Sequence, residues 1–280
     1  MNQVLGKTLY AVGLSLALLV SACATYRVAG HSVSEVFPDP KVQELVKALM
    51  DHDFDRAKAL TQQGADINYV GEDGLTPLYW VTATKDLITI ENALKLGANT
   101  NHHYEAHDGK TIITGAAYGG SPELLQLLLK YGGDPNSADQ IGETALMRAA
   151  MNGRMDNIKV LLNNGADING HMSAFLSAPV EAILQGKYDI AIYLVEHGYN
   201  FRLDMLGEAA EMRRVGRKFK ACDDRLKLFD ILKAKGVEFP VFPRLHSGTS
   251  VEEAAPGEFV WDSCLPDWYP HAAKKPAGSD

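Results

Sequence analysis

One short stretch of the chain holds the side chains best suited to metal chemistry: His102, His103 and His107, with Glu105 and Asp108 beside them. Neutral imidazoles and a carboxylate are ligands that zinc or copper would accept. Adjacent histidines in one loop, however, rarely point at a single centre, so we expect these side chains to face a partner or solvent. The sequence therefore predicts no metal site, and no motif in it calls for a cofactor.

The rest of the sequence offers no catalytic arrangement. It has no Gly-x-Ser-x-Gly elbow, no glycine-rich loop for phosphate and no His-Glu-x-x-His pair. The segment after residue 240 is too short to form a catalytic core of its own. We therefore predict that the protein is not an enzyme.

Composition bounds the class of protein and of partner. The 280 residues are 46% hydrophobic and 22% charged, which is enough apolar material for a large buried core. The formal net charge of −8 argues against nonspecific binding of nucleic acid, because phosphate repels an acidic surface. It suits a basic protein partner, although solubility explains it equally well.

The first residues have the features of an export signal. Lys7 supplies a positive charge, and the apolar run from Thr8 to Val20 is shorter than the roughly 20 residues that span a bilayer. The run closes with Leu19-Val20-Ser21-Ala22-Cys23, which resembles the bacterial lipobox: small residues before a cysteine that becomes a lipidated first residue. The alternative is an ordinary secretory signal with an incidental cysteine.

The lipobox resemblance implies a membrane anchor. Residues 1–22 would be a lipoprotein signal peptide, Cys23 would carry the lipid with its palmitate, and residues 23–38 would form a lipidated tether. In such lipoproteins an aspartate after the cysteine favours the inner membrane, whereas this chain has Ala24. The resemblance thus implies the outer membrane, facing the periplasm of a Gram-negative bacterium.

Two further cysteines, Cys222 and Cys264, remain. The periplasm is oxidising, so this pair could form a disulfide. The bridge would close a loop of about 40 residues and contribute roughly 4 kcal/mol in the chain-entropy model. Two unpaired thiols are an equally good interpretation of the sequence.

A five-residue run recurs along the chain and indicates how these side chains are positioned. Gly64-Ala65-Asp66-Ile67-Asn68 returns almost unchanged at Gly165-Ala166-Asp167-Ile168-Asn169, with degraded copies between and beyond. The glycines that lead these copies are Gly64, Gly97, Gly132, Gly165, Gly198 and Gly236. A nearly fixed period of about 33 residues predicts a stacked array of small units.

Each unit repeats three parts in the same order. A glycine-containing turn comes first, then a short helix opened by a hydroxyl residue, then an apolar helix that a glycine ends. The helix openers are Thr76, Thr111, Thr144 and, more faintly, Ser177. Small residues inside the short helices would let neighbouring helices approach closely.

The chain resembles the ankyrin-repeat family in four features: the turn, the hydroxyl residue that opens the short helix, the apolar helix and the Gly-Ala-Asp-Ile-Asn run. The resemblance implies an all-α solenoid of helix-turn-helix units with β-hairpin loops. Residues 39–68 would be N-terminal cap helices, 69–240 the array and 241–280 a C-terminal tail or lid. The histidine usual after Thr-Pro-Leu is absent, so the family's side-chain hydrogen bonds are not expected there; those positions hold Tyr79, Thr114, Met147 and Val180.

Ankyrin arrays bind other proteins on a concave face made of hairpin tips and inner helices. By register, this face would hold Glu72, Asp73, Leu75, Thr84, Tyr104, His107, Asp108, Lys110, Tyr118, Gln140, Ile141, Glu143, Met151 and Asn152. Aromatic and long side chains, such as Tyr104 and Tyr118, are of the kind that anchors interfaces. Trp80 lies inside an expected inner helix, where we favour core packing over partner contact.

The step from Gly198 to Gly236 is longer than the others and marks an insertion rich in basic residues. It carries Arg213, Arg214, Arg217, Lys218, Lys220, Arg225 and Lys227. The tail is acidic and aromatic, with Glu252, Glu253, Glu258, Asp262, Asp267, Trp261 and Trp268. Opposite charges with one cysteine each suggest a lid folded over the last repeat; a solvated charge run beside a disordered tail is the alternative.

The expected function is non-catalytic binding of a protein in the periplasm. One hypothesis is an immunity or inhibitor protein that neutralises a toxic effector, such as a phospholipase delivered by type VI secretion. A periplasmic scaffold for stress resistance or envelope assembly is the alternative of the same class. Both rest on analogy with the ankyrin and lipoprotein families.

Overall fold

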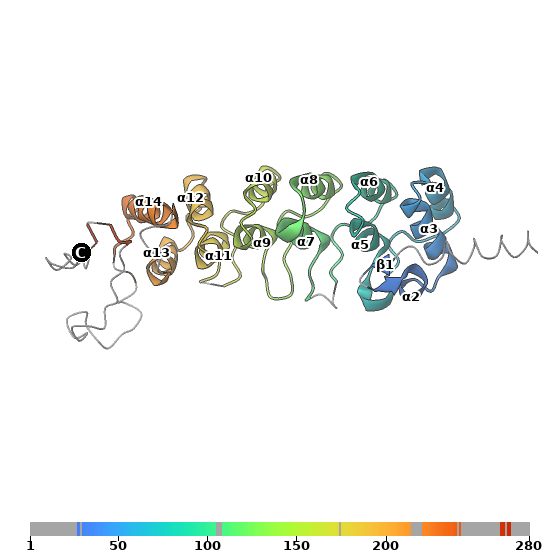
Figure 1. Ribbon diagram of the computed structural model, residues 1–280, viewed down its shortest axis with the longest axis horizontal. Helices are drawn as coiled ribbons and strands as arrows, with labels where there is room; N and C mark the ends of the chain where they lie inside the picture. Colours follow the sequence, from blue (N-terminus) through green and yellow to red (C-terminus); the bar gives the residue numbers. More distant parts are fainter. Residues whose placement is uncertain are drawn as a thin grey trace, which may run out of the picture. The chain divides into compact units, whose positions relative to one another are not determined.

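The computed structural model describes residues 27–28, 30–104, 108–173, 175–213, 220–239, 241, 264–266 and 268–269 (Figure 1). The expected signal peptide with Cys23, and His107, lie outside these residues. Within them, no helix has the length and apolar character needed to cross a membrane. The chain divides into two compact units, residues 1–107 and 108–280, and each is described by itself.

Unit 1 is a set of helices with one two-stranded hairpin. Its elements are β1 (Arg27–Val28), β2 (His31–Ser32), α2 (Val33–Val36), α3 (Pro40–Met50), α4 (Phe54–Gln62), η1 (Glu72–Gly74), α5 (Pro77–Thr82) and α6 (Leu87–Lys95). The antiparallel strands pair Arg27 with Ser32 and Val28 with His31. Helices α3 and α4 pack together, as do α5 and α6. These pairs are the helix-turn-helix units that the sequence predicts.

The segment expected as a tether is partly folded, and this corrects the prediction for residues 31–38. Ser32 caps α2 in a capping box with Glu35, and Phe37 is fully buried. The rings of Phe37 and Trp80 meet edge to face, 5.8 Å apart. The shared core comprises Val33, Val36, Phe37, Val42, Val46, Leu75 and Trp80. Trp80 is therefore a core residue, as expected.

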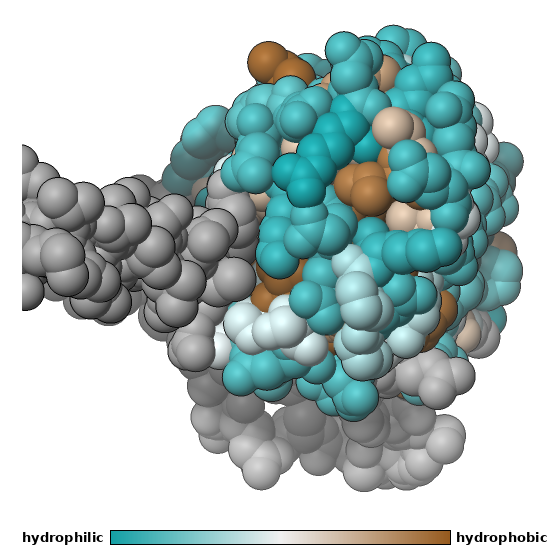
Figure 2. Space-filling model, turned by 90° about the vertical axis from the view of Figure 1, so that its right-hand side faces the viewer, coloured by the Kyte–Doolittle hydropathy of each residue, from teal (hydrophilic) through white to brown (hydrophobic). Residues whose placement is uncertain are grey.

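Two features explain why this end of the array is closed. Gly71 lies where a Cβ would clash with the carbonyl oxygen of Val36, so only glycine lets α2 approach this turn. The surface at the α3 and α4 end is mostly hydrophilic, with isolated apolar residues (Figure 2). A polar outer face is what a terminal repeat needs in order to stay soluble.

Unit 2 has its helices in two rows (Figure 1). The inner row is α7 (Ile112–Gly119), α9 (Ala145–Met151), α11 (Ala178–Leu184) and α13 (Leu203–Met212). The outer row is α8 (Pro122–Lys130), α10 (Met155–Asn163), α12 (Tyr188–Glu196) and α14 (Lys220–Ala234). Each loop before α9 and α11 is a hairpin with one antiparallel bridge, Ala138 to Thr144 and His171 to Ser177.

The predicted start and stop signals have the predicted geometry. Thr76, Thr111 and Thr144 each accept a hydrogen bond from the amide three residues on, which caps the inner helix. Ser177 makes no such cap. All six glycines that lead the repeated run have φ between 90° and 114°, the left-handed conformation that ends a helix.

Candidate functional site

The asparagine that ends the repeated run links one repeat to the next. In unit 1, Asn68 Nδ2 donates to the carbonyl oxygen of Gly97 (3.0 Å), and Asn68 Oδ1 accepts from the amide of Asn99 (2.7 Å). One side chain thus satisfies a donor and an acceptor in the following copy of the run. Without this side chain, the Gly97 carbonyl oxygen and the Asn99 amide would need water as their hydrogen-bond partner.

Unit 2 repeats the full link at Asn136 and its acceptor half at Asn169. Asn136 donates to the Gly165 carbonyl oxygen (3.4 Å) and accepts from the amide of Asp167 (2.7 Å). Asn169 Oδ1 accepts from the amide of Asn200 (2.9 Å). In the sequence, asparagine is the fifth residue of the first four runs, and this recurrence at a fixed position is the signal of its bonding role.

Hydroxyl pairs form a second set of links. Thr76 Oγ1 lies 3.0 Å from Tyr104 Oη in unit 1, and Ser177 Oγ lies 2.7 Å from Tyr199 Oη in unit 2. Thr111 Oγ1 lies 2.6 Å from Ser137 Oγ. Three of the four helix openers therefore pair with a hydroxyl further along the chain.

Two residues predicted as partner contacts are buried, and both predictions are wrong. Tyr104 is 1% exposed and Leu75 is 4% exposed. Burial raises the pKa of the Tyr104 hydroxyl to about 12, which the hydrogen bond to Thr76 partly opposes. Tyr104 is held inward because its hydroxyl finds a buried partner, and Leu75 belongs to the unit 1 core.

The remaining predicted contacts divide by exposure. Those with exposed side chains are Glu72, Asp73 and Thr84 in unit 1, and Asp108, Tyr118, Gln140 and Ile141 in unit 2. Lys110, Glu143, Met151 and Asn152 are half-buried. Within unit 2, these side chains lie on, before or just after the inner helices α7 and α9, so they share its hairpin and inner-helix face.

Tyr118 is an exposed aromatic residue on a well-anchored backbone. It is 44% exposed at the last turn of α7. Its carbonyl oxygen accepts from Asn152 Nδ2 (2.5 Å) and from Arg154 Nε (3.3 Å). A large ring whose backbone is already ordered can bind a partner at low entropic cost.

A polar network shapes the neighbouring hairpin. Asp139 Oδ1 accepts from the amides of Ile141 (3.1 Å) and Glu143 (2.9 Å). Arg148 Nη2 lies 2.9 Å from Asp139 Oδ2 and 2.8 Å from Glu143 Oε2. The network holds the turn so that Ile141 stays 66% exposed at its tip.

Among the described residues, no group of three or more histidine, cysteine or acidic side chains is arranged so that it could hold a metal ion. His102 packs edge-on against Tyr104, and its Nε2 lies 3.2 Å from the Gly74 carbonyl oxygen. Glu105 and His107, from the same stretch, lie outside the described residues.

A family model described as "Ankyrin repeats (3 copies)" matches residues 44–139, 82–172 and 113–205. Together these ranges cover residues 44–205, which is more than half of the chain. The chain belongs to the ankyrin-repeat family. The all-α ankyrin solenoid predicted from the repeated run is thereby confirmed.

Two plant proteins are similar to part of the chain. A probable E3 ubiquitin-protein ligase of Oryza sativa subsp. japonica is 33% identical over 95 residues, which are 33% of this chain and 18% of that protein. An E3 ubiquitin-protein ligase of Arabidopsis thaliana is 30% identical over 100 residues, 36% of this chain and 6% of that protein. The chain spans less than a fifth of either relative.

Glu181 on α11 gives the ankyrin face a pH-dependent group. Burial, and then the charge of Glu143, raise its pKa above the ordinary value of 4.5. The folded state thus holds this proton more tightly than the unfolded state. Stability from this group is therefore present at low pH and is lost as pH rises from about 4.5 through the folded pKa.

We predict that Glu181→Gln raises the free energy of unfolding at pH 7, by less than about 1 kcal/mol because the side chain is only half-buried. The gain should shrink below about pH 4.5, where glutamate is protonated in both states. Urea unfolding at pH 7 and at pH 4 measures the change in the free energy of unfolding, with Glu123→Gln on the exposed face of α8 as control. A gain that is equal at both pH values would contradict the assignment.

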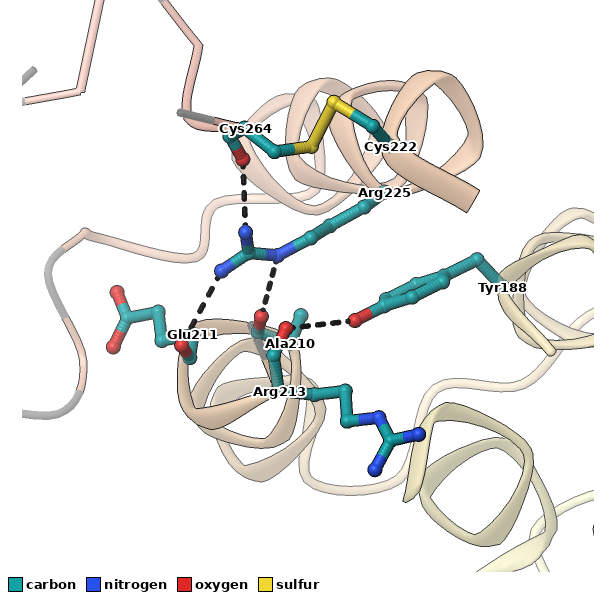
Figure 3. The surroundings of a disulfide bond; sticks show 7 residues. All are labelled: Tyr188, Ala210, Glu211, Arg213, Cys222, Arg225 and Cys264. Carbon is teal, nitrogen blue, oxygen red and sulfur yellow. Dashed lines mark hydrogen bonds between the residues drawn. A yellow bond between two sulfur atoms is a disulfide. The ribbon is translucent and has the colours of Figure 1, made fainter. Parts of the chain in front are cut away.

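The end of the ankyrin array is closed by part of the tail. A disulfide joins Cys222 on α14 to Cys264, with their Cα atoms 5.6 Å apart (Figure 3). Trp268 Nε1 donates to Asp230 (2.7 Å) and Tyr269 Oη donates to Glu211 (2.6 Å). We call residues 264–266 and 268–269 the strap. These contacts favour the lid interpretation for this part of the tail; most of residues 241–280 lie outside the described residues.

The structure corrects the expectation of one basic loop. Arg225 is fully buried in α14, and its guanidinium donates to the carbonyl oxygens of Ala210, Glu211 and Cys264 (Figure 3). Lys220 and Lys227, on the same helix, are exposed and pair with carboxylates. Arg214, Arg217 and Lys218 lie outside the described residues.

Proposed function

We propose that the protein binds another protein through the inner-helix and hairpin face of unit 2, without catalysis. Ankyrin repeats are a protein-binding architecture, and one observation supports this face in particular. Tyr118 and Ile141 remain exposed on backbones that Asn152 and Asp139 hold in place. Large apolar side chains on an ordered, polar-rimmed surface are typical binding anchors.

We further propose that the protein acts outside the cytoplasm, anchored by lipid at Cys23 to the outer membrane and facing the periplasm. The lipobox-like run that ends at Cys23 supports the anchor. The disulfide between Cys222 and Cys264 supports export, because such bonds persist in oxidising compartments. The Cys23→Ser variant should move from the membrane to the soluble fraction; continued membrane retention would contradict the anchor.

Within this setting we propose an inhibitory role, that of an immunity protein which holds a toxic effector. A membrane anchor concentrates an inhibitor where a lipid-degrading toxin would act. Because an inhibitor needs affinity and no chemistry, the exposed anchors of the unit 2 face would be sufficient for it.

Position-specific cross-linking tests both the face and the role. A photoreactive amino acid is placed at Tyr118, at Ile141 or, as a matched control on the outer helix α10, at exposed Lys159. We expect one protein to be captured from the first two positions and not from the third. Equal capture from Lys159 would overturn the assigned face. Capture of a secreted toxin would support the inhibitory role. Capture of an envelope-assembly component would contradict the inhibitory role and favour the scaffold role.

A further inference from the structure

Three apolar side chains form a row on the inner face of unit 2. Tyr118, Met151 and Leu184 occupy equivalent positions of successive repeats, in the last turns of α7, α9 and α11. Tyr118 is exposed, and the other two are half-buried. Helix α9 packs against both α7 and α11 (Figure 1), so the three equivalent positions follow one another across neighbouring helices.

The spacing of this row indicates which secondary structure of a partner segment could bind to it. Packed helices lie about 8–10 Å apart, so the row presents an apolar group at roughly that interval. Seven residues of α-helix rise about 10.5 Å, which matches one step of the row. Same-side residues of an extended strand recur at about 6.6 or 13 Å, and neither fits. A helix lying across the inner helices therefore fits better than a strand.

Charged side chains border the row on its hairpin side. Arg148 and Glu181 precede Met151 and Leu184 by three residues and so share their helix face. Asp139 and Glu143 join Arg148 from the hairpin, and Glu143 acts electrostatically on Glu181. On this hairpin side, three carboxylates thus accompany the one guanidinium of Arg148, and the excess negative charge attracts cations. Arg154, whose guanidinium donates to the Tyr118 carbonyl oxygen, comes after the C-terminal end of α9.

We propose that the unit 2 face binds an amphipathic α-helix of the partner, with an apolar residue at every seventh position and lysine or arginine one turn away. The apolar residues lie on Tyr118, Met151 and Leu184, and the basic residues face Glu143 and Glu181. This inference rests on the proposed protein-binding function and specifies the partner segment.

A designed peptide tests the proposal without knowledge of the partner. The probe is a fluorescein-labelled peptide of roughly 20 residues, a length that spans about 30 Å as a helix. It carries leucine at every seventh position and lysine four residues after each leucine, which is one helical turn away. Fluorescence anisotropy measures its affinity for the full chain with the disulfide intact. Two matched peptides serve as controls, one with the leucines at every fifth position and one with glutamate in place of lysine.

We expect the probe to bind at least tenfold more tightly than either control peptide. Met151→Asp should weaken its binding tenfold or more, whereas Met151→Leu and the outer-helix variant Lys159→Asp should leave it unchanged. Unchanged thermal unfolding would show that Met151→Asp acts on binding. Equal affinity for the three peptides, no binding of the probe, or no effect of Met151→Asp would overturn the proposal. Cross-linking from Tyr118 would then still decide the proposed function separately.

Discussion

Replacing Arg225 with methionine should lower the free energy of unfolding by about 3–5 kcal/mol, because three hydrogen bonds from a charged donor, worth roughly 1.5–3 kcal/mol each, are lost and burial of the apolar methionine offsets part of that loss. The guanidinium is fully buried and donates to Ala210 O (2.8 Å), Glu211 O (3.2 Å) and Cys264 O (2.9 Å). Methionine has similar length but no donor. Each carbonyl oxygen would lose a charge-assisted bond in a site with little access to water.

Urea unfolding followed by circular dichroism measures this loss. Lys227→Met is the matched control, because Lys227 lies on the same helix with its ammonium at the surface, 2.9 Å from Glu196. It should cost less than about 1 kcal/mol. Arg225→Lys should fall between the two, since one ammonium cannot serve three separated carbonyl oxygens. If Arg225→Met cost no more than the surface control, the role assigned to Arg225 would be refuted.

Charge alone is a poor guide to the position of Arg225, because it groups this residue with the basic insertion. Yet Cys222, Arg225, Phe229 and Leu232 recur at the three- to four-residue spacing of one helix face, and all four are buried. Periodicity was therefore the better guide. The carbonyl oxygens that receive the guanidinium lie 14, 15 and 39 residues away, beyond the reach of local patterns.

The repeat architecture was predictable because its determinants are local. A threonine cap, an apolar helix and a left-handed glycine each act within one turn of backbone, and the repetition shows them several times. The folded segment at residues 31–38 was missed for the opposite reason. Val33, Val36 and Phe37 are too few to indicate a helix by themselves, and they are ordered by contacts with Leu75 and Trp80.

The candidate site was predictable to the same extent. Register placed Tyr118 and Ile141 correctly on an exposed face, because side-chain direction follows from position in the repeat. It misplaced Tyr104, whose orientation depends on a hydroxyl 28 residues earlier in the chain. The absence of the family's histidines suggested that these hydrogen bonds were lost. In fact three of the four helix openers bond to other hydroxyls, and no single position of the sequence reveals this.

Removing the disulfide should have an effect of similar size to the Arg225 change. The bridged cysteines are 42 residues apart, and closing a loop of that length contributes about 4 kcal/mol in the chain-entropy model. The double variant Cys222→Ser/Cys264→Ser should therefore unfold at lower urea concentration than the oxidised chain. The reduced wild-type chain should unfold at the same urea concentration as the double variant. Coincident transitions for the oxidised chain and the double variant would show that the bridge does not stabilise the fold.

The two changes should not be additive, because Arg225 and the bridge hold the same strap residue. Cys264 is fixed covalently by Cys222 and through its carbonyl oxygen by Arg225. Without the bridge, that hydrogen bond must itself order Cys264, so it contributes less to stability. We expect Arg225→Met to cost about 1–2 kcal/mol less in the double-serine background than in the wild type. Costs that agree within about 0.5 kcal/mol would mean that the bridge and the guanidinium stabilise the last repeat independently.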